Sequence, residues 1–308
     1  MPTLIIAGAT LTQEDARDLA EHIFPAKALW RPAGEGSVPM ARLEGVNPIW
    51  VATVMQSLRV SLDEKGWDIN VVPDNFSIGY YKVLAVDFDS TLVEDEVIDL
   101  LGDACGCGEA VRAITQKAMA GKLRFEDSLR QRVSHLAEHP VATLETVVER
   151  AKLSPGARYL VEFMRRHRLE TWIFSGGFTE VTQPVVKRLG MTGSRANALE
   201  VDPATGLLTG RVLGPNDGNN LFNGEAKGQA LLDVCRRLGV DARHAISIGD
   251  GANDLDMTKH AGLGVGYRPK PLLRGATSFI VTHAGLDTVA AFFQEDWQER
   301  DDVVQLQY

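Results

Sequence analysis

Three apolar segments, each long enough for one buried strand, end abruptly in small or acidic residues. They are YKVLAVDF (81–88), ETWIFSGG (170–177) and HAISIGDG (244–251), and helical patterns separate them. Fully apolar strands that alternate with helices are typical of a parallel sheet that helices cover on both faces. Because ligands of such open sheets bind beyond the carboxyl ends of the strands, we expect the residues that end these segments to form one site.

The first 76 residues follow a different order of elements. Their patterns predict strands at 3–8, 27–31, 39–46 and 67–72 and helices at 12–24 and 48–65. The order β-α-β-β-α-β is that of a ferredoxin-like unit. We therefore predict two domains, a small ferredoxin-like α+β domain at 1–76 and a Rossmann-like α/β domain with a parallel sheet at 77–308.

Two further segments of the second domain have their own patterns. Residues 95–153, between the first two apolar strands, are charge-rich and mostly helical, and this segment is long enough for a small cap subdomain. Residues 197–212 carry a turn-rich Pro-Ala-Thr-Gly between two alternating apolar runs, which predicts a hairpin.

Composition narrows the class of protein. The chain has 308 residues, 44% of them hydrophobic, which suits a sizeable core, and its net charge of −9 disfavours binding to nucleic acids or to anionic membranes. Its three cysteines are too few for a disulfide framework, and Cys105-Gly-Cys107 lacks the second Cys or His cluster that a metal site needs. Neither a signal peptide nor an apolar run of about eighteen residues is present, so we expect a cytoplasmic protein.

Acidic residues follow two of the apolar strands. Asp87 and Asp89 stand two residues apart, so an extended backbone would point both carboxylates into one pocket, where they need a cation or a shared proton. Asp250 and Asp254 follow another strand. Together these residues offer the hard oxygen ligands that Mg²⁺ prefers. Each cluster taken alone is equally consistent with an acidic loop that caps a helix.

Groups suited to phosphate follow the remaining strand and a later turn. Ser175-Gly176-Gly177 offers a hydroxyl and unobstructed backbone N–H groups. Lys227 falls near a predicted helix start, where a lysine does little for the helix dipole. A solvated lysine is the simpler interpretation of Lys227 when it is considered alone.

These motifs resemble those of a known family. DFDSTL (87–92) resembles the DxDxT motif of the haloacid dehalogenase superfamily, Ser175 its second motif, and Lys227 with GDGAND (249–254) its third. VEDEVIDLLG (93–102) and AMAGKLRFEDSLRQRV (118–133) are similar to cap segments of the phosphoserine phosphatase family. The resemblance covers about residues 80–290. The N-terminal unit resembles, by element order alone, the ACT-like domain that some bacterial members carry.

The resemblance implies a role for each motif residue. Asp87 would be the nucleophile that forms an aspartyl-phosphate, and Asp89 the general acid and then the general base. Mg²⁺ would be bound by Asp87, the backbone carbonyl of Asp89 and Asp250, with Asp254 behind these ligands. The remaining substrate contacts implied are Ser175, the Gly176 N–H, Lys227 and Asn253 for the phosphoryl group, Glu94 for an ammonium, Arg132 for a carboxylate, and Met119 and Phe125 for an apolar wall.

Without the resemblance, the cap residues have ordinary explanations. Arg132 lies in a charge-dense segment where an exposed ion pair is the usual outcome, and Met119 and Phe125 are plausible core residues of the cap.

The function implied is Mg²⁺-dependent hydrolysis of O-phospho-L-serine to L-serine and phosphate, the last step of L-serine biosynthesis. Two alternatives stay open at this point. One is a related phosphatase or phosphotransferase acting on another phosphoamino acid, such as phosphohomoserine, and the other is a non-catalytic protein that senses amino acids. A homodimer is expected because ACT-like units often pair.

Overall fold

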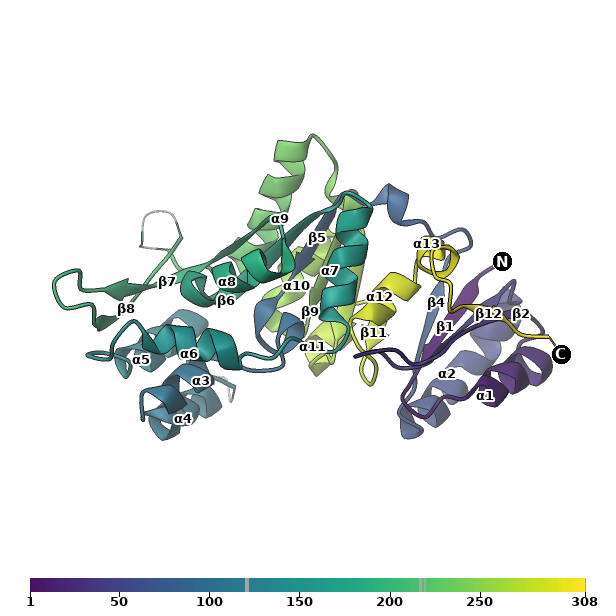
Figure 1. The fold of residues 1–308 in the computed structure, drawn as a ribbon, viewed down its shortest axis with the longest axis horizontal. Helices are drawn as coiled ribbons and strands as arrows, with labels where there is room; N and C mark the ends of the chain where they lie inside the picture. The colour runs from purple at the N-terminus through teal and green to yellow at the C-terminus, as the bar shows by residue number, and fades with distance from the viewer. Residues whose placement is uncertain (120–121, 216–217, 219, 308) are drawn as a thin grey trace. The chain divides into compact units, whose positions relative to one another are not determined.

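A computed structural model describes residues 1–119, 122–215, 218 and 220–307, with the side chain of Met119 excepted (Figure 1). The chain divides into two compact units. Unit 1 joins Met1–Tyr81, Pro155–Arg168 and Gly264–Tyr308, and unit 2 joins Lys82–Ser154 and Leu169–Leu263. Within the described residues, no helix combines the length and the apolar character that crossing a membrane requires.

Unit 1 contains the predicted β-α-β-β-α-β order. Its elements are β1 (Thr3–Ala7), α1 (Gln13–Asp18) continued by a π-helical turn (Leu19–Ile23), β2 (Lys27–Arg31), β3 (Met40–Glu44), α2 (Pro48–Glu64) and β4 (Asp68–Val72). The sheet has the order β12-β2-β3-β1-β4 and its strands are antiparallel. The edge strand β12 (Val304–Gln305) comes from the far end of the chain.

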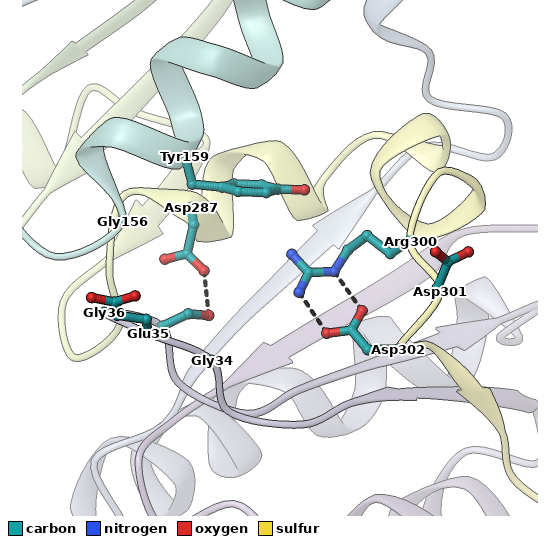
Figure 2. A pocket seen from close by; sticks show the side chains of 10 residues that line it. Gly34, Glu35, Gly36, Gly156, Tyr159, Asp287, Arg300, Asp301 and Asp302 are labelled. Carbon is teal, nitrogen blue, oxygen red and sulfur yellow. Dashed lines mark hydrogen bonds and ion pairs between the residues drawn. The ribbon is translucent and has the colours of Figure 1, made fainter.

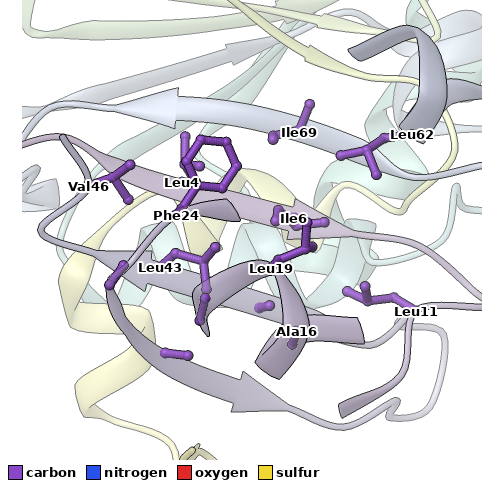
Figure 3. Close-up of a cluster of buried hydrophobic side chains, with 14 of the residues drawn as sticks. Leu4, Ile6, Leu11, Ala16, Leu19, Phe24, Leu43, Val46, Leu62 and Ile69 are labelled. Carbon is purple, nitrogen blue, oxygen red and sulfur yellow. The ribbon is translucent and has the colours of Figure 1, made fainter. Parts of the chain in front are cut away.

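The core of this sheet follows from the alternation of its strands. Leu4 and Ile6 point to the same face of β1 and pack with Leu43 of β3 (Figure 3). Helix α1 starts with a capping box between Thr12 and Asp15, and it contributes the buried Ala16 to the same cluster. The ferredoxin-like arrangement predicted from the sequence is therefore present.

Unit 1 also contains segments from later in the chain than the predicted N-terminal domain. They comprise α7 (Ala157–Arg166), β10 (Leu263–Tyr267), α11 (Pro271–Arg274), β11 (Phe279–Val281), α12 (Asp287–Ala291) and α13 (Gln294–Gln298). Arg31 is fully buried, and its guanidinium nitrogens lie 2.8 Å from Asp287 Oδ2 and 2.9 Å from Asp296 Oδ2. Because this network links β2 to α12 and α13, unit 1 includes residues that the predicted boundary at 76 assigns to the second domain. That boundary stays a prediction.

A pocket of about 450 Å³ adjoins this network. Figure 2 shows the ring of Tyr159, the carboxylate of Asp287 and the ion pair of Arg300 with Asp302 around it. Asp287 accepts a hydrogen bond of 2.6 Å from Ser37 Oγ. Both the pocket and the Arg31 network therefore belong to unit 1 alone.

Unit 2 is the predicted α/β layer. Its strands lie in the order β9 (Ala245–Gly249), β5 (Val83–Val86), β6 (Glu170–Phe178), β7 (Gly193–Val201) and β8 (Leu208–Leu213). The first four are mutually parallel, and β8 returns antiparallel to β7 as the predicted hairpin. Helices α8 (Thr179–Leu189), α9 (Gly224–Leu238) and α10 (Leu255–His260) complete the layer. All four residues of β5 are buried, as its apolar sequence predicts.

The predicted cap subdomain is helical. Between β5 and α7 the chain forms α3 (Val97–Ala104), α4 (Gly108–Met119), α5 (Phe125–Ser134) and α6 (Thr143–Arg150). The cap thus begins a few residues after Asp87, which directly follows β5.

Candidate active site

The ends of β5, β6 and β9 meet at one edge of the sheet. Strand β5 lies between the other two, and all three are parallel, so their carboxyl ends coincide. The backbone N–H of Asp87 donates to the Ile248 carbonyl oxygen at 2.9 Å, which fixes the end of β5 against β9. The strand ends predicted to form one site are therefore neighbours.

Asp87 is buried and held by three donors. Its carboxylate accepts hydrogen bonds from the Phe88 N–H at 2.7 Å and from Asn253 Nδ2 at 3.2 Å, and Lys227 Nζ lies 2.6 Å away. Donors that favour the charged form of a carboxylate also restrict its rotation. Asp87 is thus a fixed, charge-compensated carboxylate at the centre of the site.

The backbone turns sharply after Asp87. Residues Phe88–Leu92 form a π-helical turn in which Ser90 has a left-handed φ of 55°. The turn sends Asp89 towards β6, where its carboxylate accepts from Ser175 Oγ at 3.2 Å and from the Val97 N–H at 2.8 Å. The two aspartates of the motif therefore share the site but have different partners.

Asp89 is held in an environment that favours its neutral form. Burial raises the pKa of Asp89 to about 7, and the negative charges of Glu96 and Asp87 act in the same direction. The hydrogen bonds from Val97 and Ser175 offset only part of this shift. Asp89 is therefore suited to gaining and losing a proton near neutral pH.

Lys227 is the counter-charge of the acidic cluster. Its side chain is fully buried in the first turns of α9, and Nζ lies 2.8 Å from Asp254 Oδ1 as well as beside Asp87. Burial opposes the charge, but the two carboxylates raise the pKa of Lys227 above its ordinary value. The solvated lysine that the sequence allowed is thus excluded.

Asp254 organises the loop after β9. Its Oδ2 accepts from the backbone N–H groups of Asp250 and Gly251 at 3.0 and 3.1 Å. A Cβ on Gly249 would lie 2.3 Å from this oxygen, so only glycine fits there. Burial, followed by repulsion from Asp87, raises the pKa of Asp254 to about 7. Both oxygens of Asp254 therefore have hydrogen-bond partners within the protein.

The acidic cluster has the donor set of a hard divalent cation. One carboxylate oxygen from each of Asp87, Asp250 and Asp254 lies within 4.8 Å of the other two, and all three residues are buried. A single lysine balances only part of this charge, and Mg²⁺ prefers oxygen ligands of this kind. The residues present therefore fit a magnesium ion.

Ser175 and Gly176 lie on the opposite side of Asp87, at the end of β6. Ser175 is fully buried, and the Gly177 N–H donates to its Oγ at 2.8 Å. A Cβ on Gly176 would lie 3.0 Å from the ring of Phe125, which brings this cap residue directly over the strand end. Phe125 thus lies next to Gly176, whereas the side chain of Met119, at the end of α4, lies outside the described residues.

Glu96, rather than Glu94, is close to the charged groups of the site. The side chains of Glu94 and Glu96 are both exposed, and that of Glu94 has no hydrogen bond or ion pair within the described part of the chain. Glu96 accepts from Ser90 Oγ at 3.0 Å, and its charge acts on Asp89 and on Arg132. Arg132 is half-buried. Burial lowers the pKa of Arg132, whereas the carboxylates of Glu96 and Asp89 favour its charged form. Glu96 was not identified from the sequence. It immediately precedes α3, and the backbone N–H of the next residue, Val97, donates to the Asp89 carboxylate.

Two asparagines were also missed. Asn223 caps α9 through the Ala226 N–H and donates to Glu126 Oε1 of the cap at 2.8 Å. Asn197, on β7, bonds to the backbone at both Gly176 and Phe222. No sequence motif identifies them, because their partners are backbone groups or lie far away in the sequence.

Comparisons with known proteins agree with this geometry. Residues 81–262 match the haloacid dehalogenase-like hydrolase family. A curated phosphoserine phosphatase of Polaromonas is 40% identical over 72% of this chain and 94% of its own. A haloacid dehalogenase family hydrolase of Salmonella enterica serovar Typhi has a TM-score of 0.79 and 27% identity, over 96% of this chain and 99% of its own. A substrate-bound phosphoserine phosphatase complex has a TM-score of 0.63 and 33% identity, over 70% and 99%.

Replacing Lys227 by methionine tests its role as the counter-charge. The change keeps an unbranched side chain but leaves Asp87 and Asp254 buried without their cation. We expect the free energy of unfolding to fall by about 3 kcal/mol, measured by urea denaturation in EDTA with circular dichroism. The control is Lys259→Met, which breaks an exposed ion pair with Asp256 and is expected to change stability by at most about 0.5 kcal/mol. Equal stability of the two variants would contradict this role.

Proposed function

The chain belongs to the haloacid dehalogenase-like hydrolase family, and from this premise we propose that it hydrolyses O-phospho-L-serine to L-serine and phosphate. The observation that carries the proposal is the unequal pair of aspartates. Asp87 lies beside Lys227, whereas burial raises the pKa of Asp89 to about 7. Curated phosphoserine phosphatases with 40%, 35% and 39% identity support the substrate. The enzyme is a phosphoric monoester hydrolase.

Asp87 acts as the nucleophile in this mechanism. Its carboxylate is fixed by the Phe88 N–H, by Asn253 and by Lys227, so one oxygen can be held in line with the phosphorus. Attack forms an O–P bond to Asp87 and breaks the bond between phosphorus and the serine oxygen. Lys227, Ser175 and the Gly176 N–H stabilise the charge on the phosphoryl oxygens during transfer.

Asp89 moves the proton in both steps. In the first step it gives a proton to the departing serine oxygen, and it is thereby left as a carboxylate. In the second step this carboxylate takes a proton from the water that attacks the aspartyl-phosphate, which restores the starting state. The pKa of about 7 allows both states of Asp89 near neutral pH.

We propose that Asp87, Asp250 and the backbone carbonyl of Asp89 hold the Mg²⁺ ion, with Asp254 behind them. When bound, the ion neutralises charge on the phosphoryl group. Asp254 contributes by fixing the Asp250 and Gly251 backbone through its two hydrogen bonds.

The amino-acid end of the substrate is assigned to the cap. We propose that Arg132 binds the carboxylate and that Glu96, in place of Glu94, binds the ammonium. The mutual influence of Glu96 and Arg132 supports their being close enough for one amino acid to reach both. Phe125 covers the phosphoryl side at Gly176, and Met119 remains the predicted second member of this wall.

Several expectations about the whole protein stay proposals. They are an ACT-like role for residues 1–76, a phosphatase domain at 77–308 with its cap at 95–153, participation in L-serine biosynthesis, a homodimer and a cytoplasmic location. The antiparallel sheet of unit 1 supports the first of these.

Phosphate release from a substrate panel tests the proposed function. With Mg²⁺, kcat/KM for phosphoserine is expected to exceed the values for phosphothreonine, phosphohomoserine and glucose 6-phosphate by about a hundredfold. Phosphothreonine adds a methyl group beside the phosphate, phosphohomoserine places both charged groups one methylene farther away, and glucose 6-phosphate lacks both. EDTA is expected to abolish turnover, and added Mg²⁺ to restore it. A sugar phosphate as the best substrate would exclude the proposed specificity.

Glu96→Gln and Glu94→Gln form a matched pair for the ammonium contact. We expect Glu96→Gln to lower kcat/KM for phosphoserine by about thirtyfold, the value of one hydrogen bond to a charged group. Hydrolysis of p-nitrophenyl phosphate, which has no ammonium, is expected to change less than about threefold, and Glu94→Gln is expected to affect neither substrate. A loss confined to Glu94→Gln would restore the assignment made from the sequence.

A further inference from the structure

A bulge interrupts β6 at the phosphate-binding residues. Phe174 pairs with Arg195 of β7 and Phe178 pairs with Asn197, so β6 places three residues where β7 places one. The extra residues of such a bulge lose their partners in the sheet ladder. Ser175, Gly176 and Gly177 are therefore free to face the site, but their backbone needs other hydrogen bonds.

Asn197 supplies a hydrogen bond to the bulge. Its side chain is fully buried, and Nδ2 donates to the Gly176 carbonyl oxygen at 2.9 Å. The same nitrogen donates to the Phe222 carbonyl oxygen at 3.3 Å, and Oδ1 accepts from the Phe222 N–H at 2.6 Å. The amide thus joins the bulge of β6 to the segment that leads into α9.

The first segment leads to Asp89. The Gly176 carbonyl and the Gly177 N–H belong to one planar peptide, so holding the carbonyl also directs the N–H. That N–H donates to Ser175 Oγ at 2.8 Å, and Ser175 Oγ donates to Asp89 at 3.2 Å. Asn197 is therefore three hydrogen bonds away from the carboxylate that moves the proton.

The second segment leads to Lys227. Phe222 directly precedes Asn223, the N-cap of α9, and the Lys227 N–H donates to the Asn223 carbonyl oxygen at 3.0 Å. Fixing Phe222 therefore fixes the start of the helix that carries the lysine. Through its two ends, Asn197 sets the separation between the Ser175 side and the Lys227 side of the phosphoryl site.

We propose that Asn197 is a positioning residue that holds the Ser175–Gly177 bulge and the start of α9 in register around the phosphoryl group. The proposal rests on the proposed phosphatase function. It requires no contact between Asn197 and the substrate. Its effect reaches the reaction through the orientation of Ser175 and Asp89 and through the place of Lys227.

The test compares Asn197→Ala with Thr171→Val. Thr171 is also fully buried on β6, and its Oγ1 accepts from the Thr192 N–H at 3.4 Å, near the start of the strand. The control therefore removes a side-chain hydrogen bond from β6, the strand that carries the bulge, and leaves the bulge itself intact. The Thr192 N–H keeps its bond of 2.9 Å to the Thr171 carbonyl oxygen. Asn197→Asp is a second test variant that keeps the shape and the acceptor for Phe222 but, when ionised, donates to neither carbonyl.

The readouts separate positioning from a loss of stability. They are the melting temperature, kcat/KM for phosphoserine and for p-nitrophenyl phosphate, and the inhibition constant of inorganic phosphate. Because p-nitrophenolate leaves without help from an acid, misplacing Asp89 harms its release less than the release of serine.

We expect Asn197→Ala to lower kcat/KM for phosphoserine by about a hundredfold, as small misplacements in active sites do, and for p-nitrophenyl phosphate by about tenfold. The inhibition constant of phosphate is expected to rise about tenfold, the cost of one weakened contact with a charged ligand. Thr171→Val is expected to leave all three values within about twofold, because surface and core changes outside a site act mainly on stability.

Activity of Asn197→Ala equal to that of Thr171→Val would overturn the proposal, as would equal losses on both substrates with unchanged phosphate inhibition. If the alanine variant does not fold, the same outcomes apply to Asn197→Asp. A wild-type enzyme that hydrolyses p-nitrophenyl phosphate but not phosphoserine contradicts the proposed substrate alone. In that case the role of Asn197 is judged from the inhibition constant of phosphate. A rise of about tenfold in Asn197→Ala supports the role, and an unchanged value contradicts it.

Discussion

The ion pairs of Lys227 with Asp87 and Asp254 are the interaction on which the site depends. Three buried carboxylates lie within 4.8 Å of one another at the end of a parallel sheet, an arrangement that would be strongly unfavourable without a cation. The lysine comes from α9 and the carboxylates from the ends of β5 and β9. Forming these pairs therefore requires the sheet and the helix to be in place together.

This arrangement gives two neighbouring aspartates different chemistry. Asp87 forms an ion pair with the lysine, whereas Asp89 turns away towards Ser175 and Glu96. Burial and the negative charges around Asp89 raise its pKa to about 7. In the proposed mechanism one carboxylate attacks and the other exchanges a proton, and both lie within a single short turn that includes the left-handed Ser90.

The sequence predicted the parts of the site that follow from local pattern. The apolar strands that end near Asp87, Ser175 and Asp250 predicted the parallel sheet and the edge at which these three residues meet. The roles proposed for the residues came from the family resemblance. Features that depend on tertiary contacts were not predictable. Glu96 was missed because the turn at Ser90 decides which acidic side chain reaches Asp89, and Asn197 because its partners are backbone groups. The C-terminal strand β12 was not predicted, because its two residues are too few to show an alternating strand pattern.

The most direct test of the account is the identification of the phosphorylated residue during turnover. The enzyme is mixed with phosphoserine, quenched in acid within a single turnover and reduced with tritiated borohydride, which converts an aspartyl-phosphate to tritiated homoserine and releases the phosphate. The protein is then digested and the labelled peptide is identified by mass spectrometry. We expect a label on Asp87 that appears and decays with turnover and is absent from Asp87→Asn. A label on another residue, or full turnover by Asp87→Asn, would contradict it.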